Sequence, residues 1–248
     1  TTADGGIASW RARIATPPTM RELGARLFDG ATPSAAIAMT EEEADALALA
    51  GAMPFYAIPD VAVDHVPVNV RLPTGRVRGG GDGVTAFMTE SFIDELAARA
   101  RREPLGYRIA MLGDDPRMVA CLQLAARLAQ WDAGADQSGQ GLACHQMRFG
   151  AAEGRIACIA TARAGEGGVR VSRLTAAVDI GRIVNLDLAR QQIEGGLVFG
   201  MAFATGASTG YAGGLPTGGH LRDLSLPRLA DCPEIVVEFI ASDALPFD

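Results

Sequence analysis

Two adjacent glutamines and a nearby glutamate have the residue types and spacing that best suit ligand binding in this chain. They are Gln191, Gln192 and Glu194, within the stretch 179–200 that reads DIGRIVNLDLARQQIEGGLVFG. A neutral amide both donates and accepts hydrogen bonds, so it can hold a flat polar heterocycle without adding charge. A helix N-terminus close by favours an anion such as phosphate, because its first backbone N–H groups lack partners within the helix. The stretch therefore favours a polar heterocycle and a phosphate as ligands.

A turn and a helix must position these side chains. An apolar run ends at Asp179, Gly181 marks a turn, and Asn185 stands where a helix N-cap is expected. Apolar residues then recur at near-helical spacing at Leu188, Ile193, Leu197 and Met201. Three glycines follow the amides at Gly195, Gly196 and Gly200. Each costs a helix about 1 kcal/mol relative to alanine, so we expect close approach of either a neighbouring helix or a ligand.

A second glycine-rich stretch, 76–87, reads RVRGGGDGVTAF and follows a predicted strand at 61–70. Taken alone, Gly81-x-Gly83-x-x-Ala86 fits a dinucleotide-binding fingerprint. That fold needs a second strand ending in an acid about 20 residues further on. The sequence instead predicts a helix, whose apolar face is formed by Val84, Met88, Phe92 and Leu96. An NAD site is therefore disfavoured.

Together the two stretches resemble the C-terminal molybdopterin domain of the xanthine dehydrogenase and aldehyde oxidase family. Within that family, the molybdenum (beta) subunit of isoquinoline 1-oxidoreductase-type enzymes is most similar. One family motif is matched by Asp179-x-Gly181, Asn185 and Gln192-x-Glu194-Gly195. The family's Arg-Gly-x-Gly motif and the phenylalanine after it are matched by Arg78, Gly79, Gly81 and Phe87.

The resemblance implies cofactor-binding roles for Arg78, Gly79, Gly81 and Gln192. In the family, the counterpart of Gln192 hydrogen-bonds molybdopterin cytosine dinucleotide. The loop matching Arg78 places backbone N–H groups against the molybdenum ligands or the pterin, and glycine permits that close approach. We therefore expect molybdopterin cytosine dinucleotide with molybdenum as the cofactor, shared between this chain and another.

The implied fold is α+β, with two sheet-and-helix subdomains of the aldehyde oxidase/xanthine dehydrogenase molybdopterin-binding type. The order of strands and helices predicted along the chain agrees with this class. We expect a partial first molybdopterin-binding subdomain at 1–138 and a second at 139–248, with the cofactor between them. At the start of the second, Gln140 could belong to a molybdopterin loop or to the entry of a strand, and the pattern favours the strand.

The implied function is that of a fragment or split subunit of a molybdenum hydroxylase. Such an enzyme oxidises an aldehyde or an N-heterocycle and adds oxygen derived from water. The family's catalytic glutamate belongs beyond Asp248, and no acid in 234–248 matches it. We therefore assign no catalytic residue and no metal ligand here, and we expect the chain to be inactive alone. The implied partners are the remaining part of the molybdenum subunit, a small subunit with [2Fe-2S] clusters, and a small-molecule substrate.

Three positions depart from the family pattern. Leu186 replaces a usual proline, Gly80 a bulky residue near the substrate, and Val84 a glutamine. These departures leave the substrate open and favour an alternative, a non-catalytic scaffold or assembly chain that kept the fold. The retention of Arg78 and Gln192 favours cofactor binding.

Composition restricts the remaining function classes. The chain has 248 residues and a net charge of -7, without a block of basic residues, which argues against nucleic acid or an anionic membrane surface as partner. No apolar run reaches the length that a membrane span needs. Four cysteines and three histidines lack metal-site spacing, and His65 reads as a strand-face residue. We expect a soluble protein of bacterial type, cytoplasmic or periplasmic.

Several further elements are predicted from local signals. Asp115-Pro116 should start a helix, and Thr40 should cap a short helix that runs through the acidic residues after it. Alternation of apolar and polar residues predicts strands at 7–16, 154–164, 169–179 and 234–242, with the second and third forming an antiparallel pair.

Overall fold

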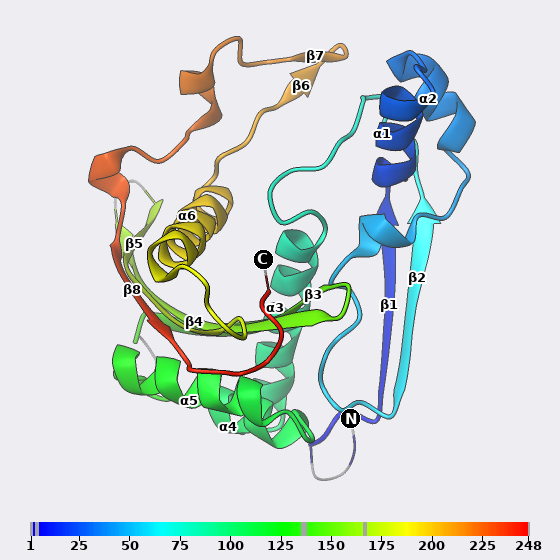
Figure 1. The fold of residues 1–248 in the computed structure, drawn as a ribbon. Helices are drawn as coiled ribbons and strands as arrows, with labels where there is room; N and C mark the ends of the chain where they lie inside the picture. Colours follow the sequence, from blue (N-terminus) through cyan, green and yellow to red (C-terminus); the bar gives the residue numbers. More distant parts are fainter. Residues whose placement is uncertain (1, 3–4, 135–137, 166–167, 248) are drawn as a thin grey trace. The chain divides into compact units, whose positions relative to one another are not determined.

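The computed structural model describes residues 2, 5–134, 138–165 and 168–247, and mixes strands and helices as predicted. It divides into two compact units (Figure 1). The N-terminal unit consists of Thr1–Pro54 and Ile58–Phe92, and the C-terminal unit of Phe55–Ala57 and Ile93–Asp248. The boundary expected at residue 138 concerns cofactor-binding subdomains and stays a prediction.

The N-terminal unit is built on two parallel strands. β1 (Ser9–Thr16) pairs with β2 (Asp60–Pro67) in a register that runs from Ser9 opposite Asp60 to Thr16 opposite Pro67. Trp10, Ala12 and Ile14 lie on the more buried face of β1, so the predicted alternation is confirmed. The connection between the strands carries α1 (Thr19–Phe28), α2 (Pro33–Thr40) and the 3-10 helix η1 (Ala46–Leu49).

The prediction that Thr40 caps a short helix is wrong, because Thr40 is the last residue of α2. The acidic residues after it form a turn that leads to Asp45. The carboxylate of Asp45 accepts hydrogen bonds from the N–H groups of Met20 and Arg21 at the start of α1. It also accepts from Leu47 and Ala48 in η1. A cap that reaches α1 from so far along the chain leaves no local signal.

Helix α3 (Asp82–Arg99) forms where predicted, but its buried side is not the predicted one. Val84, Met88 and Phe92 are exposed by 58%, 49% and 46%, whereas Thr85 and Thr89 are buried. The Thr85 hydroxyl donates to the carbonyl oxygen of Ala50 at 2.8 Å. A small hydrogen-bonding side chain is needed where the helix meets backbone, and this requirement overrides the apolar spacing.

The C-terminal unit contains a four-stranded sheet in the order β3-β4-β5-β8. β3 (Gln140–Phe149), β4 (Ala152–Gly165) and β5 (Gly168–Asp179) are antiparallel neighbours, and β8 (Glu234–Phe239) runs parallel to β5. The predicted β4–β5 pair is confirmed, as is the strand at Gln140. An irregular region carries β6 (Tyr211–Ala212), β7 (Leu215–Pro216), η2 (Leu221–Leu224) and η3 (Leu229–Asp231).

Helices cover both faces of this sheet (Figure 1). α4 (Pro104–Met111) and α5 (Pro116–Ala129) lie on one side, and α6 (Leu186–Ala204) lies on the other. The sheet side of α5 contributes buried residues to the core, namely Met118, Cys121, Leu122 and Ala125. Under α6, the buried residues are Ala176, Val178 and Val237, with Ile193 and Leu197 of the helix packed against them.

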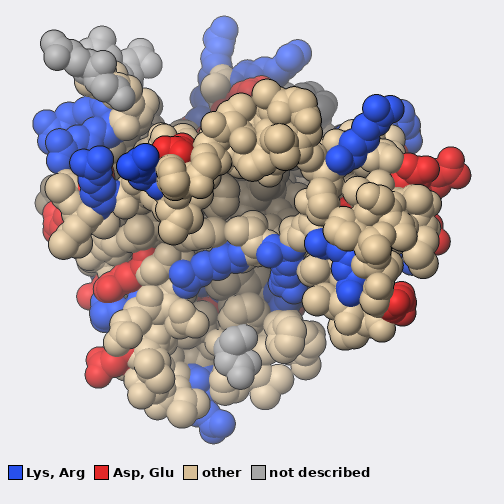
Figure 2. Space-filling model, turned by 90° about the horizontal axis from the view of Figure 1, so that it is seen from above, with Lys and Arg blue, Asp and Glu red and all other residues tan. Residues whose placement is uncertain are grey.

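Much of the surface is uncharged (Figure 2), and it includes many large hydrophobic side chains. Residues without charge form most of the face in Figure 2. The chain exposes 14748 Å², whereas two separate globular proteins sharing its mass would expose about 12,500 Å². The excess indicates surface that neither unit covers by its own folding. Among the described residues, no helix has the length and apolar character needed to cross a membrane.

Candidate functional site

The start of α6 has the geometry that the sequence predicts. β5 ends at Asp179, the chain turns at Gly181, and Asn185 takes an extended backbone conformation, with φ -137° and ψ 109°. The Asn185 side-chain oxygen accepts a hydrogen bond from the N–H of Leu188 at 3.0 Å. The predicted N-cap is therefore confirmed.

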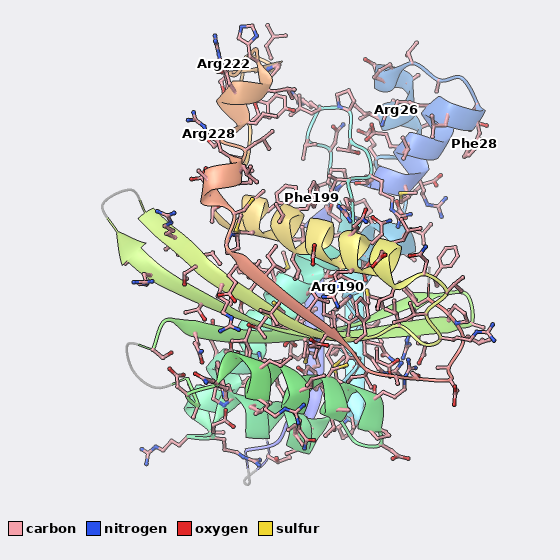
Figure 3. The ribbon with its side chains drawn as sticks, turned by 60° about the vertical axis from the view of Figure 1, so that its left-hand side comes forward. Arg26, Phe28, Arg190, Phe199, Arg222 and Arg228 are labelled. Atoms are coloured by element: carbon pink, nitrogen blue, oxygen red, sulfur yellow. The ribbon has the colours of Figure 1, made fainter. Side chains whose placement is uncertain are left out.

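The rotation of α6 is fixed by contacts on its sheet side (Figure 3). Ile193 and Leu197 pack on the sheet core. Arg190 donates to the carbonyl oxygen of Val237 at 2.6 Å, and its guanidinium carbon lies 5.6 Å from the centre of the Phe239 ring. Gln191 and Gln192 are both exposed. The helix thus presents its amides away from the sheet.

A buried ion pair holds the end of β5 that leads into α6. Asp179 is 1% exposed, and its two carboxylate oxygens accept from Nε and Nη2 of Arg117 at 2.7 and 2.5 Å. The N–H of Gly181 donates to the same carboxylate at 3.0 Å. Burial by itself raises the pKa of Asp179, but the hydrogen bonds from Arg117 and Gly181 outweigh it, so the pKa lies below its ordinary value.

A second pair of charges flanks the first. Arg155 stands directly opposite Asp179 in the β4–β5 register. Its Nε lies 3.0 Å from both carboxylate oxygens of Asp115, and its Nη2 lies 2.9 Å from Glu153. Asp115 also caps α5 by accepting from the N–H of Met118 at 3.1 Å. The charges therefore connect the start of α5 to the ends of β4 and β5.

The segment 240–247 runs beside the turn that precedes α6. The N–H of Ile240 donates to Val178 at 2.8 Å, and the N–H of Phe247 donates to Ile180 at 2.9 Å. In the other direction, the N–H of Arg182 donates to Ala244 at 3.0 Å. Gly181 has φ +71°, and a Cβ there would overlap the carbonyl oxygens of Ala244 and Leu245. Only glycine fits this crossing of the two segments.

The loop with Arg78 belongs to the N-terminal unit. Gly79 and Gly80 have φ +81° and +57°, and the N–H of Gly80 donates to Val77 at 2.9 Å, which closes a turn. A Cβ at Gly81 would lie 3.0 Å from the carbonyl oxygen of Ala48. Gly81 is thus required for packing whether or not it contacts a ligand. Arg78 and Gly79 are exposed.

The architecture around this loop differs from a dinucleotide-binding unit. A Rossmann unit continues from its helix into a second parallel strand. Here α3 is followed by α4 and α5, and the described strand after them is β3, which belongs to the other unit. This order of helices and strands further disfavours an NAD site.

The four residues predicted to bind the cofactor fall into different units. Arg78, Gly79 and Gly81 lie in the N-terminal unit, and Gln192 lies in the C-terminal unit. Their meeting at one cofactor stays a prediction. At Gly200 no described residue makes the close approach expected at the α6 glycines, since a Cβ there would find no described atom within 4 Å. Close approach of a ligand stays a prediction.

Sequence reasoning missed Arg117 and Arg190. A carboxylate at the buried end of a strand signals that a cation should accompany it, since an unpaired buried charge is costly. That signal does not say which arginine, because Arg117 and Asp179 are 62 residues apart. Arg190 reads locally as one more polar residue on a helix.

Two of the cysteines are poor nucleophiles at neutral pH. Burial raises the pKa of Cys121 and of Cys158 to about 12. Cys144 is buried with its Sγ 3.4 Å from the Tyr56 hydroxyl. His65 gives no indication of a metal site, because its Nδ1 accepts a hydrogen bond from the N–H of Asp45 at 2.9 Å. Among the described residues, no group of three His, Cys, Asp or Glu side chains could hold a metal ion.

The part of the chain that contains α6 is similar to a known protein family. Residues 123–233 match the family model of the molybdopterin cofactor-binding domain. The chain is 26% identical over 195 residues to the isoquinoline 1-oxidoreductase subunit beta of Brevundimonas diminuta. That match covers 78% of this chain and 25% of the relative, so the chain spans about a quarter of the relative's length.

Solved structures show the same fold. Quinoline 2-oxidoreductase from Pseudomonas putida 86 matches 75% of this chain and 49% of its own, with a TM-score of 0.60 and 12% identity. Aldehyde oxidoreductase from Desulfovibrio desulfuricans matches 79% of this chain and 39% of its own, with a TM-score of 0.53 and 11% identity. The α+β prediction and the resemblance drawn from the two motifs are confirmed.

Proposed function

We propose that the chain supplies part of the cofactor-binding surface of a molybdenum hydroxylase, since residues 123–233 match the family model of the molybdopterin cofactor-binding domain. The substrate class is an aldehyde or an N-heterocycle. The chain acts as part of a larger assembly and is not active alone. The observation that carries the proposal is the start of α6, a capped helix whose amides point away from the sheet.

The donor set there fits molybdopterin cytosine dinucleotide. The Gln192 amide can both donate to and accept from a cytosine or pterin edge. The N–H groups of Leu186 and Asp187 begin the helix, where an anion such as phosphate is favoured. In the N-terminal unit, Gly79 leaves open space beside its backbone, so a ligand could approach Arg78 and Gly79 closely.

When bound, such a cofactor supplies the oxidation of the substrate carbon. The residues of this chain bind and orient it: Gln192 through its amide, and Arg78, Gly79 and Gly81 through the backbone of their turn. No described residue takes a catalytic role in the proposal. The base that accepts a proton from the attacking water comes from the part of the molybdenum subunit outside this chain.

The exposed apolar surface supports an assembly. Large hydrophobic side chains are exposed by 50% or more at both ends of the α6 region. They are Val184, Leu186, Leu188, Phe203, Leu215, Leu221, Leu226, Leu229 and Leu245. A concentration of exposed large apolar side chains is typical of surfaces where another polypeptide packs. We propose the remaining part of the molybdenum subunit as that neighbour, with a small [2Fe-2S] subunit as a further partner.

Substitution of Gln192 tests the cofactor role directly. We expect Gln192→Ala to lower the molybdenum and cytidine monophosphate content of the natively purified assembly about 3- to 10-fold, the size of one lost hydrogen bond. Elemental mass spectrometry measures the molybdenum, and chromatography after acid hydrolysis measures the nucleotide.

Gln191→Ala is the matched control, because Gln191 is an exposed neighbour of the same type that the matched family motif does not include. It should retain the cofactor. Equal occupancy in wild-type and Gln192→Ala assemblies would contradict the assignment. An intact wild-type assembly without molybdenum would instead favour a scaffold or assembly chain.

A further inference from the structure

We infer that the Arg117–Asp179 pair aligns the turn before α6 with the segment 240–247, which makes Arg117 a positioning residue for cofactor binding. This inference rests on the proposed function. Neither side chain reaches the amides of α6 itself. They act through the backbone on either side of the crossing at Gly181.

The Asp179 carboxylate lies beside both segments. It accepts from the N–H of Gly181 on the turn before α6. Ser242, in the segment after β8, helps to lower the pKa of Asp179, so its side chain lies near the carboxylate. Both carboxylate oxygens are held in one orientation by the two-pronged contact of Arg117. Rotation of the carboxylate would break its bond to Gly181, the residue at which the two segments cross.

The two segments cross so closely that the position of one depends on the position of the other. Beyond the end of β8, the hydrogen bonds from Ile240, Arg182 and Phe247 join them. The crossing is tight at Gly181, where no Cβ fits. A small rotation of the turn would therefore displace the segment or separate it. The helix that carries Gln192 starts a few residues beyond this crossing.

Arg117 is itself held in place by its neighbours. It comes from the first turn of α5, on the face of the sheet opposite α6 (Figure 1). Its Nη2 also donates to the carbonyl oxygen of Glu153 at 3.3 Å. The Asp115 cap fixes the start of α5 and is bound in turn by Arg155. Arg117 thus transmits the position of α5 and β4 to the start of α6.

Hydrogen exchange in the natively purified assembly tests the alignment. In Arg117→Met, we expect amides in 180–188 and 242–247 to exchange about tenfold faster than in wild type, because local opening becomes easier. Amides in the middle of β4 should be unchanged. Arg117→Lys should give an intermediate rate, since lysine keeps the charge but lacks the two-pronged geometry.

Arg108→Met is the control for general destabilisation. Arg108 is fully buried and pairs with Asp94 at 2.6 Å in the same unit. It should leave exchange at 180–188 and 242–247 unchanged. If Arg117→Met does not accelerate these amides, or if Arg108→Met accelerates them equally, the inference is wrong.

The double variant Arg117→Met with Asp179→Asn separates positioning from charge burial. It leaves no unpaired buried charge, so overall stability should recover. If the pair positions the site, fast exchange at 180–188 and low molybdenum content should persist in the double variant. Return of both to wild-type values would overturn the inference. Should Gln192→Ala keep its molybdenum, the proposed function fails, while the exchange data still decide whether the pair aligns the segments.

Discussion

Two buried carboxylates, one in each unit, organise their surroundings in different ways. Asp45 is 3% exposed and accepts four backbone hydrogen bonds, from Met20, Arg21, Leu47 and Ala48, at 2.7 to 3.2 Å. Asp179 is 1% exposed and is bound by an arginine. Helix N-terminal dipoles thus satisfy one carboxylate, and a full positive charge satisfies the other.

The difference lies in what remains when the carboxylate is removed. At Asp45 the remaining groups are neutral N–H groups at helix starts, which water can reach after small movements. At Asp179 the remaining group is a partly buried guanidinium, which is far more costly to leave unpaired. Two sites of equal burial should therefore respond unequally to the same substitution.

The largest effect is expected for Asp179→Ala. Loss of one partner of a buried ion pair costs about 3–5 kcal/mol. Urea unfolding followed by circular dichroism measures this change in the free energy of unfolding. Asp243→Ala, an exposed carboxylate in the segment beside the turn, should change it by less than about 0.5 kcal/mol. A cost below about 1 kcal/mol for Asp179→Ala would show that water replaces the pair.

A smaller effect is expected for Asp45→Ala, because it removes caps from two helices at about 1 kcal/mol each, or about 2–3 kcal/mol with the buried donors. The change in the free energy of unfolding should appear in the unfolding transition of the N-terminal unit. Asp45→Asn should recover part of it, since one carbonyl oxygen remains to accept. If Asp45→Ala lowers the free energy of unfolding more than Asp179→Ala does, the helix N–H groups stabilise a buried carboxylate more than an arginine does. The expected order of the two sites would then be reversed.

The same contrast explains what the sequence could predict. Asn185 and Asp115 cap helices within three residues of themselves, and strand alternation is equally local, so both were predicted. Asp45 also acts on Met20 and Arg21, 25 and 24 positions away, and Arg117 acts on Asp179, 62 positions away. No local pattern contains these distant partners. The α3 face was predicted wrongly because the hydrogen bond from Thr85 to Ala50 matters more there than apolar spacing. The motif residues Arg78 and Gln192 came from family resemblance.

Acid should weaken the C-terminal unit through Asp179. Because the pKa of Asp179 is lower in the folded protein than in the unfolded chain, its ionised form stabilises the fold above the unfolded pKa of about 4. This stabilisation is lost as the pH falls from there through the folded pKa. Unfolding free energies measured from pH 7 to pH 3 should fall more steeply in wild type than in Asp179→Asn. Parallel curves would mean that other carboxylates dominate the acid response.

The smallest effect is a gain from Leu186→Pro, which places proline at the first position of α6. Proline is favoured there because that N–H has no partner within the helix, and Asn185 already has the extended conformation that precedes proline. Leu186 is 50% exposed, so little packing is lost. We expect thermal or urea unfolding to show a gain of about 0.4–1 kcal/mol, because proline mainly restricts the unfolded chain.

The size of that gain in two backgrounds tests how firmly Asp179 and Arg117 hold the turn. If the native turn is already fixed, proline removes freedom from the unfolded chain alone, and the whole gain appears. If Arg117→Met loosens the native turn, proline restricts both states and the gain should shrink towards zero. An equal gain in both backgrounds would show that Asn185 and the crossing at Gly181 fix the turn without the ion pair.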